Sequence, residues 1–237
     1  MEDSRYYLFQ VMQRYENSDG ISFPVYYQNL HETGIDNKFI FAVVNAFDEI
    51  KFRDSDFISF PIELIVDYIQ RTHIYYLQKA IPDIKKTILL LAKSYERGHP
   101  LVNDLDLFFI KYQTELEAHF YNEDHKLLPY VALLNNAQKT IKYFHTWLLK
   151  KNAYSITNFV NDHDDTQTDL RKIQNHIMMY HPPRSSVISY RALLSQLRML
   201  EKDLYVHSSI EEFVLIPKAL QLENMLIEKV RANLHLN

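Results

Sequence analysis

The sequence predicts an all-α protein, built as an up-and-down four-helix bundle with a small helical N-terminal segment. Its 237 residues include only 3 glycines and 8 prolines, which leaves little material for the turns of β-hairpins. Apolar residues recur every three to five positions along the long stretches, as one buried helix face requires. Short connections join these stretches, which favours helices running up and down beside one another.

The part of the chain before residue 58 is expected to be the small helical segment. Turn-forming residues interrupt it at NSDG (17–20), ETGID (32–36) and KFRDSD (51–56). From Phe57 onward the apolar residues become regularly spaced. We therefore divide the chain into an N-terminal segment, 1–57, and the bundle, 58–237.

The first two long helices follow from their apolar stripes. The first is expected to begin near Phe57, to bend at Pro82 and to end near Gly98. Its buried face comprises Ile62, Ile65, Val66, Ile69, Ile74 and Leu77. The second should begin near Asn103 or Asp104. Its stripe comprises Leu105, Phe108, Phe109, Tyr112, Leu116 and His119.

The second half of the chain supplies the other two long helices. The third is expected from Ser155 to about Met179, because two prolines soon follow within residues 181–183. The fourth should begin near Ser186, and Pro217 begins or kinks a last helix.

Charge and hydropathy exclude several classes of partner. No stretch approaches the roughly 20 uninterrupted apolar residues that span a bilayer. The start, MEDSRYYLFQ, is acidic and tyrosine-rich, where a secretory signal would be basic and then apolar. The net charge is -4 and lysines and arginines are scattered, so no basic stripe is available for nucleic acid. We expect a cytoplasmic protein that binds neither membrane nor nucleic acid.

The chain contains no cysteine. This rules out disulfides, thiolate zinc sites, cysteine-bound iron–sulfur clusters and thiol catalysis. Any metal ion must therefore be held by histidines and carboxylates.

One sequence pattern occurs twice. HFYNEDHKLLP (119–129) and HSSIEEFVLIP (207–217) align without a gap. In each copy a glutamate follows the histidine by four residues, which places both side chains on one face of a helix. An acidic residue, a leucine and a proline follow at the same spacing in both copies. The repeat predicts two helices with the same task.

Four histidines have nearly constant spacing, because intervals of 46, 44 and 44 residues separate His73, His119, His163 and His207. Each lies in a different predicted helix, and an up-and-down chain returns to the same level each time. Four imidazoles and the carboxylates of Glu123 and Glu211 are then expected to converge as ligands for two metal ions. This donor set suits iron or manganese, two glutamates can bridge a metal pair, and ligand type alone leaves zinc open.

Residues 58–223 resemble the RIC (repair of iron centres) family of hemerythrin-like di-iron proteins. The segment YHPPRSSVISYRALLSQLRMLEKDLYVHSSIEEFVLIPKALQLE (180–223) resembles the family pattern PP…YRAL…LE-DL-H-H…E…LFPRAL. SYERGHPLVNDLDLFFIKYQTELEAHFYNEDHKLLPYV (94–131) is similar to the family's second helix. DHDD (162–165) stands where the family has an acidic residue followed by HD.

The resemblance implies a hemerythrin-like bundle that holds two iron ions joined by an oxo or hydroxo bridge, with manganese and zinc as less favoured metals. It implies His73, His119, His163 and His207 as terminal ligands and Glu123 and Glu211 as bridges. Nitric oxide, oxygen or peroxide would bind at open iron positions during nitrosative or oxidative stress. Damaged iron–sulfur proteins would receive released iron.

The N-terminal segment departs from the family. Members often carry a GIDFCCGG-like motif there, whereas residues 34–36 of this chain, GID, are followed by Asn37, Lys38 and Phe39. If residues 22–57 are a remnant of that domain, whatever its thiols do is lost.

Two other functions remain open at this point. The chain could be a di-iron module that senses oxygen, nitric oxide or redox state and signals through residues 1–57. It could also be a metal-free helical adaptor with a hydrogen-bonded polar core. Near the proposed ligands, Tyr76 and Tyr121 are candidates for supporting or redox-active phenols, and Asp162 and Asp164 for residues that orient His163.

Overall fold

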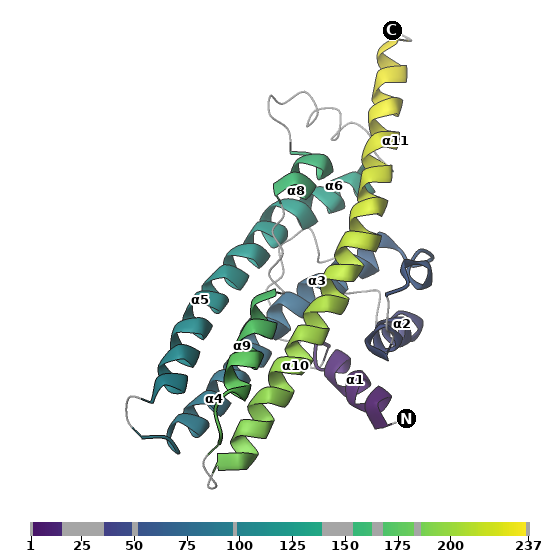
Figure 1. Ribbon diagram of the computed structural model, residues 1–237. Helices are drawn as coiled ribbons and strands as arrows, with labels where there is room; N and C mark the ends of the chain where they lie inside the picture. Colours follow the sequence, from purple (N-terminus) through teal and green to yellow (C-terminus); the bar gives the residue numbers. More distant parts are fainter. Residues whose placement is uncertain are drawn as a thin grey trace. The chain divides into compact units, whose positions relative to one another are not determined.

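The computed structural model describes residues 2–15, 36–48, 52–96, 99–138, 154–162, 168–182 and 186–235 (Figure 1). Within these ranges the protein is all-α and no strand is present. The helices are α1 (Glu2–Met12), α2 (Asn37–Asp48), α3 (Ile62–Tyr75), α4 (Ile81–Ala92), α5 (Pro100–Asn122), α6 (Leu128–Ala137), α8 (Ile156–Asp162), α9 (Thr168–Met178), α10 (Val187–Ile210) and α11 (Ile216–His235).

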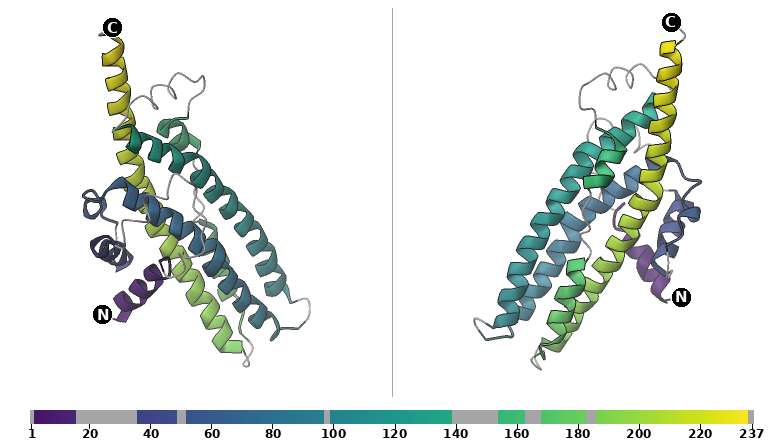
Figure 2. Two further views of the ribbon diagram at one scale, coloured as in Figure 1. Left: turned by 180° about the vertical axis from the view of Figure 1, so that it is seen from behind. Right: turned by 45° about the horizontal axis from the view of Figure 1, so that its top comes forward.

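Three five-residue π turns link successive helices without a break in the ribbon (Figures 1 and 2). They are η5 (Tyr76–Ala80) between α3 and α4, η6 (Glu123–Leu127) between α5 and α6, and η8 (Glu211–Leu215) between α10 and α11. In each case the second residue after the turn is a proline, namely Pro82, Pro129 and Pro217.

The prolines account for the π turns. A proline has no N–H to donate and its ring collides with the carbonyl four residues back, so the helix around it must widen or kink. Here the residue just before each proline donates its N–H five residues back, as Ile81 does to the carbonyl of Tyr76. The bend predicted at Pro82 and the new helix or kink predicted at Pro217 are therefore π turns within helices that continue.

The third predicted helix is found in two pieces. Residues from Ser155 to Met179 were expected to form one helix, but the structure has α8 and α9, and residues 163–167 between them lie outside the described ranges. His181-Pro182 ends this part of the chain as predicted, because α9 stops at Met178.

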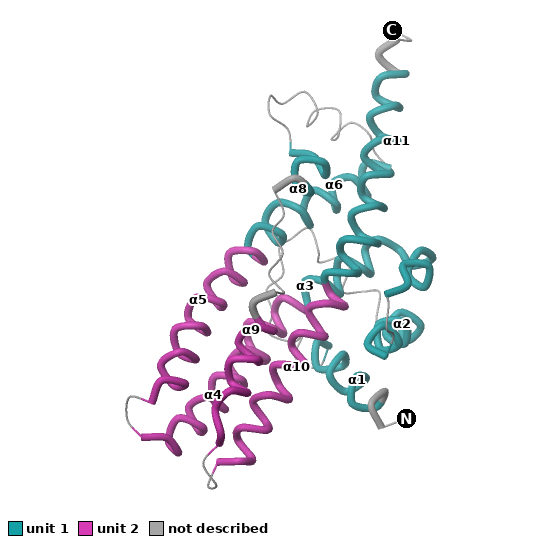
Figure 3. The backbone as a smooth tube through the Cα atoms, viewed as in Figure 1, with its two compact units in different colours: residues 1–71, 121–164, 208–237 teal, residues 72–120, 165–207 magenta. Residues whose placement is uncertain are grey.

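The chain divides into two compact units, coloured separately in Figure 3. Unit 1 comprises residues 1–71, 121–164 and 208–237, and unit 2 comprises residues 72–120 and 165–207. The predicted boundary near residue 57 stays a prediction.

Unit 2 is built around one hydrophobic core. Its members lie on η5 and α4, on α5, on α9 and on α10, and these helices run side by side in both views of Figure 2. The fully buried members include Tyr76, Ile84, Phe109, Leu116, Phe120, Leu193 and Leu197. Polar contacts at the edge join α9 to its neighbours, since His176 Nε2 lies 2.7 Å from Asp104 Oδ2 and Gln174 Nε2 donates to Glu201 Oε2 at 2.7 Å.

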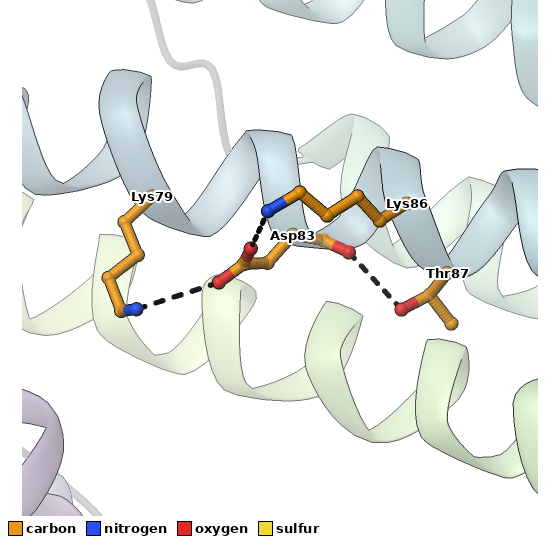
Figure 4. Close-up of polar contacts among 4 residues, drawn as sticks. All are labelled: Lys79, Asp83, Lys86 and Thr87. Atoms are coloured by element: carbon orange, nitrogen blue, oxygen red, sulfur yellow. Dashed lines mark hydrogen bonds and ion pairs between the residues drawn. The ribbon is translucent and has the colours of Figure 1, made fainter.

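The exposed side of η5 carries a small charged network (Figure 4). Asp83 Oδ1 accepts a hydrogen bond from Lys86 Nζ at 2.9 Å, and its other oxygen lies 3.8 Å from Lys79 Nζ. Thr87 Oγ1 donates to the backbone carbonyl of Asp83 at 3.2 Å. These exposed ion pairs stabilise the turn by only about 0.5 kcal/mol each, so the core and the proline define it.

In unit 1 the N-terminal helices pack against the start of α3. Asp36 caps α2, because its Oδ1 accepts the backbone N–H groups of Lys38 at 2.8 Å and Phe39 at 3.0 Å. The Phe39 ring is buried and packs edge-on against Phe57, Phe60 and Tyr68. The described part of the N-terminal segment therefore shares a core with the first long helix.

The other end of unit 1 is organised around a buried carboxylate on α11. Glu223 Oε1 accepts a hydrogen bond from the hydroxyl of Tyr130 at 2.5 Å and one from the backbone N–H of Ile156 at 3.3 Å. Burial and this hydrogen bond raise the pKa of the Tyr130 phenol. One side chain thus ties α11 to α6 and to the first turn of α8.

None of the described helices has both the length and the apolar character that crossing a membrane requires.

Candidate metal centre

Two buried histidines meet at one end of unit 2. His73 lies in the last turn of α3 and His207 in the last turn of α10, and their side chains are 1% and 2% exposed. Their Nε2 atoms are 3.3 Å apart. At this distance at most one of the two nitrogens carries a hydrogen directed at the other, so a lone pair is directed into the shared space.

Aromatic rings hold both imidazoles in place. The His73 ring stacks on Phe120 with a centroid distance of 4.1 Å, and the His207 ring meets the same phenylalanine edge-on at 6.0 Å. Phe120 is fully buried in the unit 2 core. The rings therefore exclude water from the two nitrogens and restrict how the imidazoles can turn.

A carboxylate completes a group with the two histidines. Glu123 follows the unit 2 part of α5 by three residues on an unbroken helix, one turn beyond His119. The ligand atoms of His73, Glu123 and His207 all lie within 4.8 Å of one another, and all three side chains are buried. Two imidazoles and a carboxylate form a donor set that suits iron, manganese or zinc, so this group could hold a metal ion.

Glu211 has a matching place on another helix. It is the first residue of η8, as Glu123 is of η6, and it is buried. It lies one turn beyond His207, just as Glu123 lies one turn beyond His119. The repeated sequence pattern therefore folds twice into one local structure, with a histidine in the last α-helical turn and a glutamate that opens a π turn.

Two of the expected histidines are not part of the three-residue group. His119 lies in the last turn of α5, half-buried, with its ring against that of Phe120 at a centroid distance of 5.7 Å. His163 lies outside the described residues, as does Asp164. Asp162 is the last residue of α8, and its side chain is not among those described.

The two candidate tyrosines differ in their surroundings. Tyr76 is fully buried, and its hydroxyl donates a hydrogen bond to Asp203 Oδ1 at 2.8 Å. Its ring meets that of His207 edge-on at 5.8 Å. Tyr121 is 60% exposed and stacks on His125. Only Tyr76 is thus in a position to support the buried histidines.

Sequence reasoning missed Asp203 and the third π turn. Asp203 precedes His207 by four residues, so helical spacing alone places it on the same face. The third turn, η5, lacks the histidine–glutamate pair but shares an aliphatic residue followed by proline at positions 81–82, as at 128–129 and 216–217. That dipeptide was the available signal.

Comparison with known proteins gives distant relatives, and no family model matches the chain. The chain is 21% identical over 157 residues to a Staphylococcus epidermidis protein named "Iron-sulfur cluster repair protein ScdA", which covers 66% of each chain. It is 21% identical over 154 residues to a protein of the same name from Staphylococcus haemolyticus, which covers 65% of each chain. The chain thus spans just under two thirds of the length of these relatives. It is a distant homologue of proteins named for the repair of iron–sulfur clusters.

Proposed function

We propose that the chain is a cytoplasmic, hemerythrin-like four-helix bundle that holds two non-haem iron ions and acts in the repair of iron–sulfur clusters damaged by nitrosative or oxidative stress. The observation that carries this proposal is the buried group of His73, Glu123 and His207, whose ligand atoms converge within 4.8 Å. The distant relatives named for iron–sulfur cluster repair favour iron over manganese and zinc as the metal.

The proposed ligands are six. His73, His119, His163 and His207 are the terminal ligands, and Glu123 and Glu211 are the bridges. The equivalent positions of the two glutamates at the start of η6 and η8 support equal roles for them. A carboxylate has two oxygens, so each glutamate can contact both ions of a pair.

The side chains around the group prepare it for this role. Phe120 and Tyr76 provide apolar rings beside the imidazoles, which keeps bulk water away from the nitrogen lone pairs. When bound, the iron pair would offer open coordination positions for nitric oxide, oxygen or peroxide, and iron for release to a damaged cluster. Small oxidants and iron–sulfur proteins are therefore the proposed partners, and nucleic acid and membrane are not.

The first test is the metal content of the full chain purified without oxygen. We expect about two iron ions per chain and, after oxidation, the optical charge-transfer bands of an oxo-bridged pair. The loaded protein should then restore activity to an enzyme whose iron–sulfur cluster has lost iron, whereas the metal-free protein should not. A chain that retains zinc or no metal, and that cannot be reconstituted with iron, would contradict the proposal and favour the metal-free adaptor.

A second candidate function is supported by the packing of the N-terminal segment. The Arg71 guanidinium lies over the ring of Tyr15 at 4.9 Å, and Arg71 Nε donates to Asp67 Oδ2 at 2.8 Å. Burial, together with the charge of Asp67, raises the pKa of the Tyr15 phenol. Arg71 precedes His73 by two residues on α3, so the N-terminal segment contacts the helix that carries a proposed ligand. This arrangement suits a sensor of oxygen, nitric oxide or redox state.

Limited proteolysis tests the sensor function. If the chain signals through residues 1–57, the rate of cleavage in that segment should differ between the reduced, oxidised and nitric oxide-treated iron protein. Equal rates in all three states would exclude signalling through this segment.

A further inference from the structure

Two polar contacts link the same pair of helical segments in unit 2. The first joins His73 to His207 through their Nε2 atoms, 3.3 Å apart. The second joins the Tyr76 hydroxyl to Asp203 Oδ1 at 2.8 Å. Tyr76 follows His73 by three residues, and Asp203 precedes His207 by four, so the second contact lies one turn from the first on both helices.

We infer that Tyr76 and Asp203 are a positioning pair that sets the separation and the orientation of His73 and His207. The Tyr76 ring reinforces the hydrogen bond through its contacts with both neighbours of the histidines. It meets His207 edge-on at 5.8 Å and lies parallel to Phe120, on which His73 also stacks, at 5.7 Å. A shift of Tyr76 would therefore move both imidazoles.

The position of Tyr76 in the chain supports a role at this centre. It is the first residue of η5, as Glu123 is of η6 and Glu211 is of η8, and each precedes a proline by six residues. All three side chains are buried. Tyr76 thus occupies on the first long helix the place that a proposed bridging glutamate occupies on each of the other two.

The chemistry of Asp203 explains why the contact is specific. A buried carboxylate is costly unless it is hydrogen-bonded, and Asp203 is 2% exposed. A charged acceptor strengthens the hydrogen bond from a phenol, and the bond has one favourable length and direction. A leucine pair at these positions would fill the space without specifying the registration of the two helices.

The test compares three variants of the full chain, with cobalt(II) as an optical probe of the site. Tyr76→Phe removes the hydroxyl and keeps the ring. Asp203→Asn keeps an oxygen that accepts from Tyr76 and removes the charge. Tyr112→Phe is the control, because Tyr112 is a buried phenol in the same core and stacks on Phe108 rather than on a histidine.

For Tyr76→Phe we expect about a tenfold loss of cobalt(II) affinity and an altered visible spectrum of the bound ion. Asp203→Asn should stay within about threefold of the wild-type affinity, because the hydrogen bond is retained. Wild-type affinity and spectrum in Tyr76→Phe, or equal losses in Tyr76→Phe and Tyr112→Phe, would overturn the inference. A loss in Asp203→Asn as large as that in Tyr76→Phe would overturn it as well, because charge and not position would then be the cause.

The metal part of this test rests on the proposed function, and a second readout separates the two. In the metal-free chain labelled with ¹⁵N-histidine, Tyr76→Phe should shift or split the ring signals of His73 and His207, while Tyr112→Phe should leave them unchanged. If the wild-type chain binds neither cobalt nor iron, the proposed centre fails, and these signals alone decide the inference. Unchanged signals in Tyr76→Phe would then overturn it.

Discussion

At the scale of the residue, the centre is defined by polar side chains in an apolar interior. His73, Glu123 and His207 are as buried as the aromatic residues around them. Imidazole and carboxylate groups lose the contacts of bulk water in such a place, and a metal ion is one of the few partners that can replace all of them at once. The spacing of histidines in the sequence predicted which side chains to examine, because ligands on facing helices must share one level.

The proposed bridges can be tested by replacing each glutamate with an apolar residue of similar size. Glu123→Leu and Glu211→Leu should each abolish the spectrum of coupled iron ions and lower iron affinity by more than about tenfold. Far-ultraviolet circular dichroism should remain helical, since a leucine suits a buried helix position. Glu212→Leu is the matched control, because Glu212 is exposed beside Glu211. Unchanged spectra in both variants would refute the bridging roles.

Other contacts of this scale were beyond sequence reasoning. Tyr76 and Asp203 are separated by 127 positions, and their hydrogen bond exists only because α10 packs beside η5. No local pattern reports such a pairing. Their partnership required the structure, whereas the histidine–glutamate pairs lie within one helical turn and could be found from spacing.

At the scale of the element, helices with an apolar stripe were predicted well. Five of the six residues expected on the second helix's stripe lie on α5 as buried or packed core residues. The π turns were not predicted, because an inserted residue shifts the periodicity locally and leaves only the proline as a sign. The third helix was predicted as one piece because its apolar pattern runs through residues 163–167, which lie outside the described ranges.

The cap of α2 allows a test of the N-terminal packing. Asp36→Ala removes the oxygen that accepts two backbone N–H groups, and should lower the free energy of unfolding by about 1 kcal/mol. Urea titration measures this change. Lys38→Ala, an exposed substitution in the first turn of the same helix, should change stability by less than about 0.5 kcal/mol. A neutral Asp36→Ala would show that α2 does not depend on this cap.

The junction of α6, α8 and α11 predicts a dependence on pH. The pKa of Tyr130 is raised from its ordinary 10.0, mainly by burial and then by Glu223, so the folded state keeps the phenolic proton. This contribution to stability is complete below pH 10 and is lost as the pH rises above it. In urea titrations from about pH 8 to pH 11, Tyr130→Phe should lose stability less steeply than the wild type. Tyr6→Phe, at an exposed position, should follow the wild type; a Tyr130→Phe curve parallel to the wild type would contradict the assignment.

At the scale of the whole molecule, the all-α class was predictable from few glycines and from the apolar periodicity. The division into units was not, because unit 1 and unit 2 each combine segments that are distant in the sequence. Long helices that pass from one unit to the other carry no change of composition at the boundary. The donor set was predictable in part, since the structure brings His73, Glu123 and His207 together and describes His119 and Glu211 elsewhere on the same helices.

Metal binding should stabilise the whole chain. An ion that binds only the folded state at about 100 times its dissociation constant adds about 2.7 kcal/mol, or roughly 5 to 10 °C in Tm for a chain of this size. Thermal unfolding with and without iron(II), in the absence of oxygen, measures the shift. The Glu123→Leu and Glu211→Leu double variant is the control and should show no shift. Equal shifts in both proteins would place the bound iron elsewhere.

The three π turns make the chain unequally tolerant of changes in length. Each turn holds one residue more than an α-helix needs, so deleting a single residue there would restore regular helix and rotate everything that follows by about 100°. Such a deletion within η6 or η8 would separate the face that carries the histidine from the face that packs after the proline. Substitutions at these positions change one side chain, whereas a deletion changes the phase of a whole helix. Natural variation in this protein should therefore conserve the spacing from Glu123 to Pro129 and from Glu211 to Pro217 more strictly than the exposed residues in between.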